Sequence, residues 1–502
     1  MSMSELDPTQ SAALIAELHA QFTRQFGSCK KFETHISYVL LAGDNAYKFK
    51  KPVNLGFLNF STRALRHDYC EREVALNHRY APQLYWGVLA LVRGPQGLAL
   101  GAAGDPLDYA VWMCRFADGA RLDERLEAGS VDGLAFADLG KSIGEMHLHA
   151  PRPFVGSRYG SAELSVAQML AGLEPLRDVA PTAAAVLDPY RVAVGASTER
   201  LAARLREGFI RDCHGDLHLS NIVHLDGRWV PFDCIEFNDE LRYIDTLSDF
   251  AFVKMDLDLR GTRQFSNILL NAYLSGCGDY TGLNLLRLYC AYRSLVRAKV
   301  AGLASVSLDG SAQAEAIARS AQHLTLAGEY LAAPPPPSLL ITYGASGSGK
   351  SWRSQGLATA HGYIHLRSDI ERRRLAGRPV NAVSGSQLNG GIYAGFATEA
   401  TYQRLKSLAE TALNAGYSVI VDATFLEAAQ RAAFRALARQ LKLGFGILAC
   451  DAPEDVLRAR IDARHAAGGD PSEATQDVLT QQLAARELLS PAERAEIVEE
   501  AL

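Results

Sequence analysis

One segment near the middle of the chain carries residue types that suit phosphoryl transfer. His214-Gly215-Asp216-Leu217-His218-Leu219-Ser220-Asn221 contains an Asp and, five positions later, an Asn, and Pro231-Phe232-Asp233 adds a second Asp. Phosphoryl transfer to a hydroxyl needs a carboxylate that receives the proton, and side-chain oxygens that hold Mg²⁺ against the phosphates. The alternative is a turn between two strands, rich in turn-forming residues. The apolar runs on both sides and the downstream Asp favour the catalytic interpretation.

The same spacing occurs in the protein-kinase catalytic loop, which is followed by a metal-binding Asp on a later strand. Gly215 stands where that loop has an Arg, and in this the segment resembles the aminoglycoside phosphotransferase branch of the kinase-like fold. The resemblance implies that Asp216 is the base and that Asn221 and Asp233 are magnesium ligands. Asp-Phe-Gly of protein kinases is replaced here by Asp233-Cys234-Ile235.

A kinase-like fold also needs a strand lysine that pairs with the nucleotide phosphates. Residues 35–51 predict a hairpin with a turn at Gly43-Asp44-Asn45. Lys48 and Lys50 are two positions apart, so both project from one face of its second strand. We expect Lys48 to be the lysine that binds the nucleotide phosphates, and Lys50 is the second candidate. An edge strand protected by lysines is the alternative.

The lysine in turn needs a glutamate on a helix. Residues 63–80 predict a helix that offers Glu71 and Glu73, which cannot share one helical face. The family pattern favours Glu73, and a solvated charged face is the competing interpretation. Further along, Asp245 and Asp249 lie one turn apart at the start of a helix. They are either charges at a helix N-terminus or a brace for the catalytic loop, and the sequence leaves both open.

One kinase feature is missing from the N-terminal region. Between Cys29 and Ser37 the sequence has no glycine-rich G-x-G-x-x-G motif that would cover the phosphates. This absence motivates an alternative in which the N-terminal domain is a non-catalytic binding or regulatory pseudokinase.

A second phosphate site follows a proline-rich boundary. Residues 332–337 (Ala-Ala-Pro-Pro-Pro-Pro) predict a stiff spacer, and residues 338–343 a buried strand. The strand leads into the octet Gly344-Ala345-Ser346-Gly347-Ser348-Gly349-Lys350-Ser351. This is a Walker A motif, in which backbone N–H groups surround the phosphates. Lys350 is expected to reach the β- and γ-phosphates, and the Ser351 hydroxyl to bind Mg²⁺.

Two further strands are predicted at residues 363–366 and 419–424. Asp369 follows the first, and Asp422 lies at the carboxyl end of the second. Open parallel sheets bind ligands at the carboxyl ends of their strands. Both side chains should therefore lie at the same edge of the sheet as Lys350.

This order of elements resembles small P-loop kinases of the polynucleotide-kinase, zeta-toxin and gluconate-kinase group. The resemblance implies that Asp369 is the base and that Arg372 or Arg367 anchors anionic groups of the acceptor. It also implies that Asp422 supports the metal or the acceptor.

An arginine-rich helix is predicted at residues 455–464. In such kinases a helical lid brings arginines onto the transferring phosphoryl group, whose negative charge they stabilise. Arg460 and Arg464 are one turn apart and share a face, and they are the expected lid arginines. A solvent-facing charged helix is the alternative.

Bulk composition limits the environment of the protein. The 502 residues carry a net charge of −5 with 48% hydrophobic and 21% charged residues, so we expect no global attraction to nucleic acid or anionic membranes. No apolar run approaches the ~20 residues that span a bilayer. The N-terminus lacks the pattern of a signal peptide. Eight scattered cysteines without a CxxC pair suggest reduced thiols in a cytoplasmic protein.

These observations predict an α+β kinase-like domain of the two-lobed aminoglycoside-phosphotransferase fold, followed by an α/β P-loop kinase domain with a parallel sheet. The expected boundaries are 1–331 (N-lobe about 25–117, C-lobe about 118–331), 332–337 for the linker, and 338–502. The arrangement is similar to bacterial proteins described as bifunctional aminoglycoside phosphotransferase/ATP-binding proteins. It implies ATP (or GTP) and Mg²⁺ as cofactors and transfer of the γ-phosphoryl group to a hydroxyl of a small molecule or nucleic-acid end. The acceptor and the oligomeric state stay open.

Overall fold

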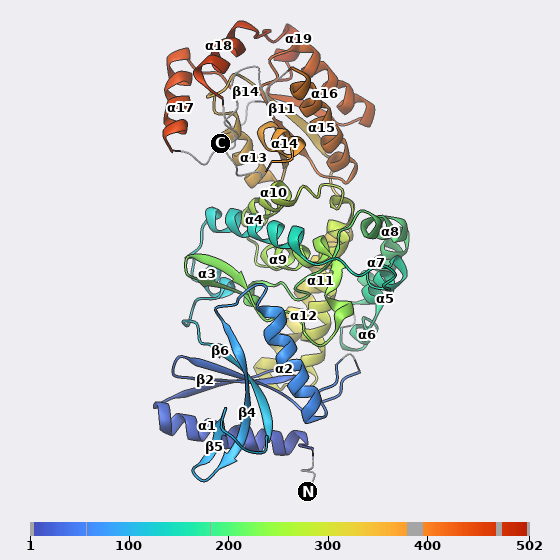
Figure 1. The fold of residues 1–502 in the computed structure, drawn as a ribbon. Coiled ribbons are helices and arrows are strands. Elements are labelled where there is room, and N and C mark those ends of the chain that lie inside the picture. Colours follow the sequence, from blue (N-terminus) through green and yellow to red (C-terminus); the bar gives the residue numbers. More distant parts are fainter. Residues whose placement is uncertain (1–4, 57, 181, 379–394, 468–473, 499–502) are drawn as a thin grey trace. The chain divides into compact units, whose positions relative to one another are not determined.

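The computed structural model describes residues 5–56, 58–180, 182–378, 395–467 and 474–498 (Figure 1). The parts of the predicted domains at 1–4 and 499–502 lie outside these residues. The chain divides into two compact units that interleave along the sequence. Unit 1 comprises Met1–Val131, Ala150–Gln168 and Leu201–Asp256, and unit 2 comprises Asp132–His149, Met169–Arg200 and Leu257–Leu502. Helices α5 (Ala162–Leu170), α8 (Thr198–Arg206) and α9 (Thr246–Leu259) pass from one unit into the other.

Unit 1 is built on a six-stranded antiparallel sheet of order β1-β2-β3-β6-β4-β5. Its strands are β1 (Cys29–Glu33), β2 (Ser37–Ala42), β3 (Asn45–Lys50), β4 (Tyr85–Gly94), β5 (Gly97–Leu100) and β6 (Asp108–Cys114). The predicted hairpin is confirmed as β2 and β3. Strand β1 was not predicted; it pairs with β2 where a kinase glycine-rich loop is expected.

Helices cover both faces of this sheet. Helix α1 (Pro8–Phe26) begins at a capping box on Asp7 and packs Phe22 against Tyr47 of β3. Because side chains alternate along a strand, Lys48 and Lys50 project from the opposite face of β3. That face meets α2 (Arg63–Asn77), the helix predicted to carry the glutamate.

The rest of unit 1 holds the segment with the predicted catalytic residues. Strand β7 (Ile210–Asp212) pairs with β10 (Tyr243–Asp245), and β8 (Ile222–Leu225) with β9 (Arg228–Pro231). Short helical turns lie at α3 (Leu122–Glu127), η1 (Leu219–Asn221) and η2 (Asp239–Leu241). The residues from His214 to Asn221 therefore connect two short strand pairs.

Unit 2 contains a helical part and a P-loop part. The helical part has α4 (Gly133–His149), α6 (Pro175–Val179), α7 (Ala184–Ala196), α10 (Arg263–Cys277), α11 (Leu283–Ser305) and α12 (Gly310–Leu331). Gly140 allows α4 to approach α10 closely, since a Cβ there would lie 2.5 Å from the Leu269 carbonyl oxygen.

The P-loop part has a four-stranded parallel sheet of order β12-β13-β11-β14. Its strands are β11 (Ser338–Tyr343), β12 (Ile364–Arg367), β13 (Val419–Asp422) and β14 (Gly444–Ala449). The helices are α13 (Lys350–His361), α14 (Ser368–Leu375), α15 (Gly395–Asn414), α16 (Ala428–Leu441), α17 (Glu454–Ala467), α18 (Gln476–Ala484) and α19 (Pro491–Arg494). The predicted α/β fold with a parallel sheet is confirmed, and β14 is the strand that sequence reasoning missed.

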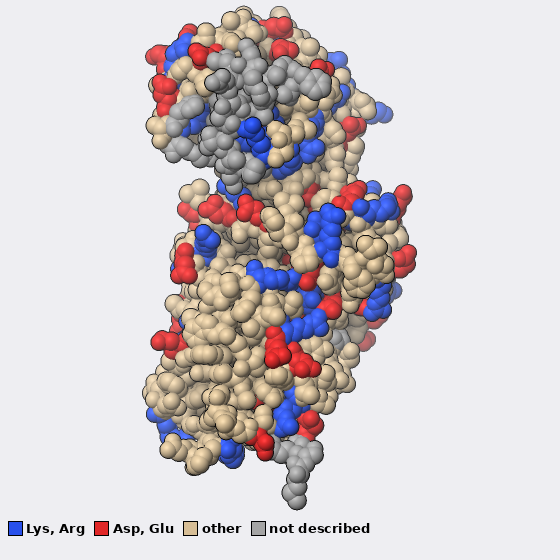
Figure 2. Space-filling view, in the orientation of Figure 1, with Lys and Arg blue, Asp and Glu red and all other residues tan. Residues whose placement is uncertain are grey.

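The surface agrees with the modest net charge. Figure 2 shows basic and acidic side chains interspersed over the face drawn, without one sign dominating its described residues. Within the described ranges, every helix is too short or too polar to cross a bilayer. All eight cysteines lie within the described residues, where they form no disulfide bond.

Candidate active sites

The catalytic-loop segment in unit 1 is fixed by a carboxylate from α9. The backbone N–H of His214 donates to Asp249 Oδ2 at 3.0 Å, and that of Gly215 donates to Oδ1 at 2.9 Å. Asp249 is fully buried, so these bonds are shielded from water. The bracing role considered for Asp249 is thus confirmed. Asp245 differs, because it forms a buried ion pair with Arg204, Nε to Oδ2 2.7 Å.

Gly215 is required by the backbone. Its φ is +87°, and a Cβ would lie 2.8 Å from the Leu241 carbonyl oxygen. The neighbouring His214 is buried, with Nε2 2.9 Å from the Phe232 carbonyl oxygen. Burial lowers the pKa of His214 more than the nearby Asp249 raises it, so the ring is neutral and donates to that oxygen.

Asp216 and Asn221 lie side by side at the end of this loop. The Asn221 amide nitrogen donates to the Asp216 carbonyl oxygen at 3.0 Å and to its Oδ2 at 3.3 Å. This leaves the Asn221 amide oxygen as the group that a cation can take. His218 Nε2 is 3.4 Å from Asp216 Oδ2. The Asp216 side chain is 37% exposed, so a hydroxyl substrate can reach it.

Both lysines of β3 meet the same glutamate of α2. Lys48 Nζ lies 2.9 Å from Glu73 Oε1 and 2.5 Å from Asp233 Oδ1. Lys50 Nζ lies 2.7 Å from Glu73 Oε2 and also pairs with Glu236. The structure therefore brings together Lys48, Glu73 and Asp233, with Lys50 as a further partner. Glu71, the other glutamate considered, is 63% exposed beside His67.

Opposite charges keep this cluster ionised. Burial by itself raises the pKa of Glu73, but Lys48 and Lys50 outweigh it and lower that pKa to about 2. Burial likewise lowers the pKa of Lys48, and Asp233 and Glu73 outweigh it and raise the pKa well above that of an ordinary lysine. At neutral pH the site thus presents the charged ammonium group of Lys48 beside the ionised carboxylate of Glu73.

Two residues that sequence reasoning missed hold Asp233 in place. The Asp233 N–H donates to Tyr85 Oη at 3.0 Å, and the Cys234 N–H donates to Asn77 Oδ1 at 3.0 Å. Asp233 has a φ of +61°, a region that Asp tolerates better than most residues. Oxygen donors from Asp233 and Asn221 fit a hard cation such as Mg²⁺. Asn77 belongs to the pattern after Glu73 that favoured this glutamate, but its contact with Cys234 was not predicted, and Tyr85 lies in no recognisable motif.

The second candidate site is the loop between β11 and α13 in unit 2. Gly347 has a φ of +83°, and a Cβ there would lie 2.7 Å from the Leu457 carbonyl oxygen. At Gly344, with a φ of +151°, a Cβ would lie 2.1 Å from the Cys450 carbonyl oxygen. Helix α13 begins at Lys350, so its N-terminus adjoins the loop. This is the strand-loop-helix arrangement that binds phosphates.

Lys350 and a glutamine of α18 form hydrogen bonds with backbone groups of this loop. Lys350 Nζ donates to the Ala345 carbonyl oxygen at 2.8 Å, and the Ser346 N–H donates to Gln482 Oε1 at 2.8 Å. Burial lowers the pKa of Lys350 more than Asp422 raises it. Gln482 was not predicted, because a lone glutamine on a helix carries no motif.

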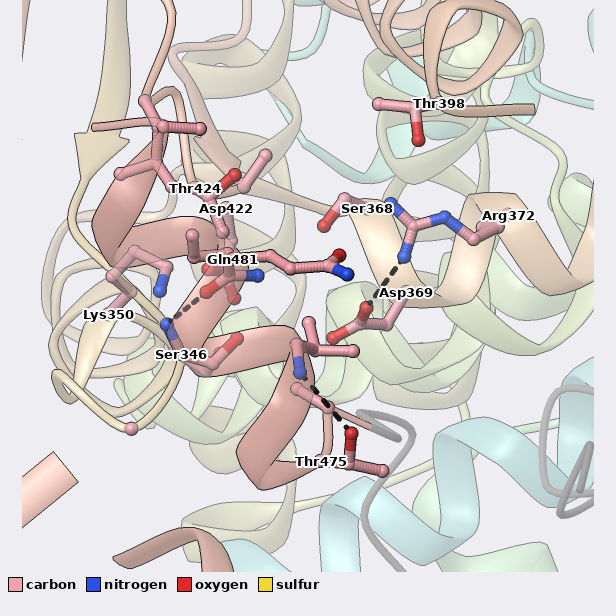
Figure 3. Close-up of a pocket in the computed structure, with 18 of the residues that line it drawn as sticks. Ser346, Lys350, Ser368, Asp369, Arg372, Thr398, Asp422, Thr424, Thr475 and Gln481 are labelled. Carbon is pink, nitrogen blue, oxygen red and sulfur yellow. Dashed lines mark hydrogen bonds and ion pairs between the residues drawn. The ribbon is translucent and has the colours of Figure 1, made fainter. Parts of the chain in front are cut away.

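A cavity of about 890 Å³ opens beside the loop. The predicted residues that line it are Ser346, Gly347, Gly349, Lys350, Ser351, Asp369, Arg372, Asp422, Arg460 and Arg464. Figure 3 shows Lys350 and Ser346 on one side of this cavity and the ion pair of Asp369 with Arg372 on another. That pair has Oδ1 and Nη1 3.3 Å apart. Arg367 is not among the described residues that line the cavity.

The two acidic residues of this cavity have different surroundings. His365 Nε2 is 3.2 Å, and Arg367 Nε 3.8 Å, from Asp422 Oδ2. Burial raises the pKa of Asp422, but His365, Arg367 and Lys350 together hold it well below its usual range. Such a carboxylate is a poor proton acceptor and a good ligand for a cation. Asp369 is 23% exposed and is the better placed of the two to meet an acceptor.

Two of the arginines of α17 face the cavity and a third does not, as their spacing predicted. Arg460 Nη1 donates to the Gly347 carbonyl oxygen at 3.1 Å, and Arg464 Nη2 to the Ala474 carbonyl oxygen at 3.3 Å. Arg458 instead pairs with Glu454 on the same helix, Nη2 to Oε1 2.6 Å. Arg460 and Arg464 therefore face the cavity, whereas Arg458 lies away from it.

Comparison with known proteins bears on both units. Residues 339–489 match the model of the AAA_33 family, described as an AAA domain. Uncharacterized protein Rv2004c of Mycobacterium tuberculosis strain H37Rv is 34% identical over 467 residues, covering 91% of this chain and 89% of that protein. Uncharacterized protein Mb2027c of Mycobacterium bovis matches with the same identity and coverage.

Solved structures show more distant likenesses. A choline/ethanolamine kinase family protein from Mesorhizobium loti has a TM-score of 0.33 at 16% identity, covering 62% of this chain and 99% of its own. A gluconokinase from Sinorhizobium meliloti 1021 has a TM-score of 0.24 at 21% identity, covering 33% and 82%.

Proposed function

The chain belongs to the family of the mycobacterial protein Rv2004c, and we propose that it has two ATP·Mg²⁺-dependent phosphotransferase sites, one in each unit. A kinase-like fold combined with an AAA_33 P-loop domain is the organisation of a phosphotransferase in general. The observation that carries the two-site proposal is the cluster of Lys48, Glu73 and Asp233. Its charges are paired as a nucleotide site requires, although the glycine-rich motif is missing.

In the kinase-like site, Lys48 binds the nucleotide phosphates and Glu73 holds its ammonium group in place. Asn221 and Asp233 would hold Mg²⁺, which neutralises charge on the phosphates when bound. Asp216 accepts the proton of the acceptor hydroxyl, and the Asn221 amide orients its carboxylate. The domain boundary that this proposal assumes is the proline segment at 332–337.

In the P-loop site, the loop N–H groups and Lys350 bind the phosphates, and Ser351 and Asp422 would hold Mg²⁺. Asp369 accepts the proton of the acceptor, and Arg372, its ion-pair partner, anchors an anionic group. Arg460 and Arg464 stabilise the charge on the transferring group. Arg367 acts through Asp422 in this scheme, since its Nε is 3.8 Å from that carboxylate. The acceptor is a small molecule or a nucleic-acid end.

A second candidate keeps the P-loop site as the sole catalyst, with unit 1 as a binding module. The turn between β1 and β2 favours it, because Thr34 rather than a glycine-rich stretch shapes that turn. The Thr34 hydroxyl accepts the Ser37 N–H at 3.0 Å. On this view Lys48 would bind a nucleotide weakly or not at all.

An acyl-phosphate derivative of ATP separates the two candidates, since it acylates lysines that contact nucleotide phosphates. Mass spectrometry of wild-type peptides should find ATP-protectable acylation at both Lys48 and Lys350. Acylation at Lys350 alone would exclude nucleotide binding by unit 1. Asp216→Ala and Lys350→Ala variants, assayed with γ-labelled ATP against metabolites and oligonucleotides, then assign each activity to its site. If Asp216→Ala leaves every activity intact while Lys350→Ala abolishes all, the two-site proposal fails.

A further inference from the structure

The charge cluster of unit 1 extends beyond the three residues that a nucleotide needs. It forms an alternating chain of carboxylates and ammonium groups in the order Asp233, Lys48, Glu73, Lys50, Glu236. Each carboxylate oxygen of Glu73 accepts a hydrogen bond from a different lysine: Oε1 from Lys48 and Oε2 from Lys50. Lys50 and Glu236, at one end of this series of ion pairs, have no role in the mechanism proposed above.

Burial separates the roles of the two lysines. The Lys50 side chain is 1% exposed, between Glu73 and Glu236, which are 0% and 4% exposed. Its ammonium group also lies 4.9 Å from the centre of the Phe60 ring. These partners surround the ammonium group, so Lys50 is held away from a nucleotide. Lys48 is the more exposed lysine, at 11%, and faces Asp233.

Lys50 and Glu236 also join two elements that are distant in sequence. Glu236 lies three residues after Asp233, and Glu73 lies on α2. Two other residues of α2 reach the same segment, since Asn77 accepts the Cys234 N–H and Arg72 pairs with Asp239. Helix α2 is therefore attached to the segment that carries Asp233 directly by Asn77 and Arg72. Glu73 of α2 adds a third attachment through Lys50 of β3, which pairs with Glu236.

We propose that Lys50 and Glu236 are positioning residues of the kinase-like site, which tie α2 to the Asp233 segment and thereby fix Glu73 and Lys48. The proposal rests on nucleotide binding by unit 1. If Lys50 is removed, one oxygen of Glu73 loses its ammonium partner, and that carboxylate is free to rotate. Lys48 then keeps Asp233 as its fixed counter-charge but loses the fixed position of Glu73, and its distance from the phosphates varies.

The test uses the full chain and the acyl-phosphate derivative of ATP, with Lys350 of the same molecule as internal reference. In Lys50→Met we expect the maximal rate of Lys48 acylation to fall at least tenfold while Lys350 acylation is unchanged. The probe concentration for half-maximal rate should change less than threefold, because the nucleotide contacts themselves remain. Glu236→Gln should lower the maximal rate severalfold, and Lys50→Arg should retain at least half of it.

Lys51→Met is the matched control, because Lys51 pairs with Glu33 outside the cluster. It should leave both acylation rates unchanged. Thermal unfolding of each variant shows whether unit 1 is folded at the assay temperature. If unit 1 of Lys50→Met is unfolded at that temperature, the positioning role is tested with Glu236→Gln and Lys50→Arg in their folded state. Unchanged Lys48 acylation in folded Lys50→Met or Glu236→Gln overturns the positioning role. Absence of Lys48 acylation in the wild type would instead refute nucleotide binding by unit 1.

Discussion

The two candidate sites are built in opposite ways. In unit 2 a continuous octet forms the loop proposed to bind the phosphates through its backbone N–H groups, and its glycines permit the close approach of Cys450 and Leu457. In unit 1 side chains from β3, α2, the catalytic loop and the segment after β9 meet through ion pairs and hydrogen bonds. A backbone site tolerates side-chain changes around it, whereas the side-chain site depends on each partner.

The lysines of the two sites illustrate this difference. Lys48 lies between two carboxylates that raise its pKa, whereas Lys350 donates to a backbone carbonyl and burial lowers its pKa. In the proposed function, a nucleotide replaces ion-pair partners at Lys48, whereas at Lys350 it replaces a backbone carbonyl. We expect the P-loop site to bind nucleotide more tightly than the kinase-like site.

Loss of Lys350 should give the largest effect. Lys350→Ala removes the only charge of the octet, and we expect P-loop activity to fall by on the order of 10³-fold. Isothermal titration should show one nucleotide site lost and the weaker site retained. Loss of both sites on this substitution would contradict the independent assembly of the two sites.

Asp216→Asn should come next, and it tests the chemistry of unit 1 without removing its nucleotide. The amide keeps the shape of the side chain but cannot accept a proton, so kcat of the unit 1 activity should fall by roughly 10²–10⁴-fold. KM for ATP should stay within a factor of about two, since Asp216 does not bind the phosphates in the proposed mechanism. A rise in KM with unchanged kcat would assign Asp216 to nucleotide binding instead.

Arg460 and Arg458 form a matched pair on α17. Arg460→Ala should lower kcat of the P-loop activity by roughly 10–100-fold, because Arg460 faces the cavity beside Gly347. Arg458→Ala should leave kcat unchanged, since Arg458 pairs with Glu454. Equal effects of both substitutions would show that α17 acts as a charged helix and not through a specific lid arginine.

The smallest effect concerns acid stability of unit 1. The pKa of Glu73 is about 2 in the fold and 4.5 in its absence. Glu73 therefore stabilises the fold above about pH 4.5, and this contribution is lost as the pH falls from 4.5 towards 2. The loss is on the order of 3 kcal/mol. The unfolding temperature, measured across this pH range, should fall more steeply with decreasing pH for the wild type than for Glu73→Gln. If the two proteins show the same dependence on pH, the contribution assigned to Glu73 is wrong.

Sequence reasoning reached most of the fold because the signals were local. Two strand-like runs around the Gly43-Asp44-Asn45 turn predicted β2 and β3, and a continuous apolar run predicted β11. The octet from Gly344 to Ser351 specified its own loop. Strands β1 and β14 were missed, since Cys29–Glu33 is mostly charged and exposed and residues 444–449 carry two glycines. The pattern of burial that defines these strands arises only from their neighbours in the sheet.

The sequence by itself determined the residue types on which the proposed chemistry rests: an Asp-to-Asn segment, a complete Walker A octet, and carboxylates at the ends of predicted strands. Such motifs are fixed by backbone geometry within a few residues. The tertiary structure alone decided that Glu73 joins both lysines, that Asp249 braces the loop, and that Gln482 takes the Ser346 N–H. These contacts join residues 23 to 136 positions apart. Chain folding, and not spacing along the sequence, brings them within hydrogen-bonding distance.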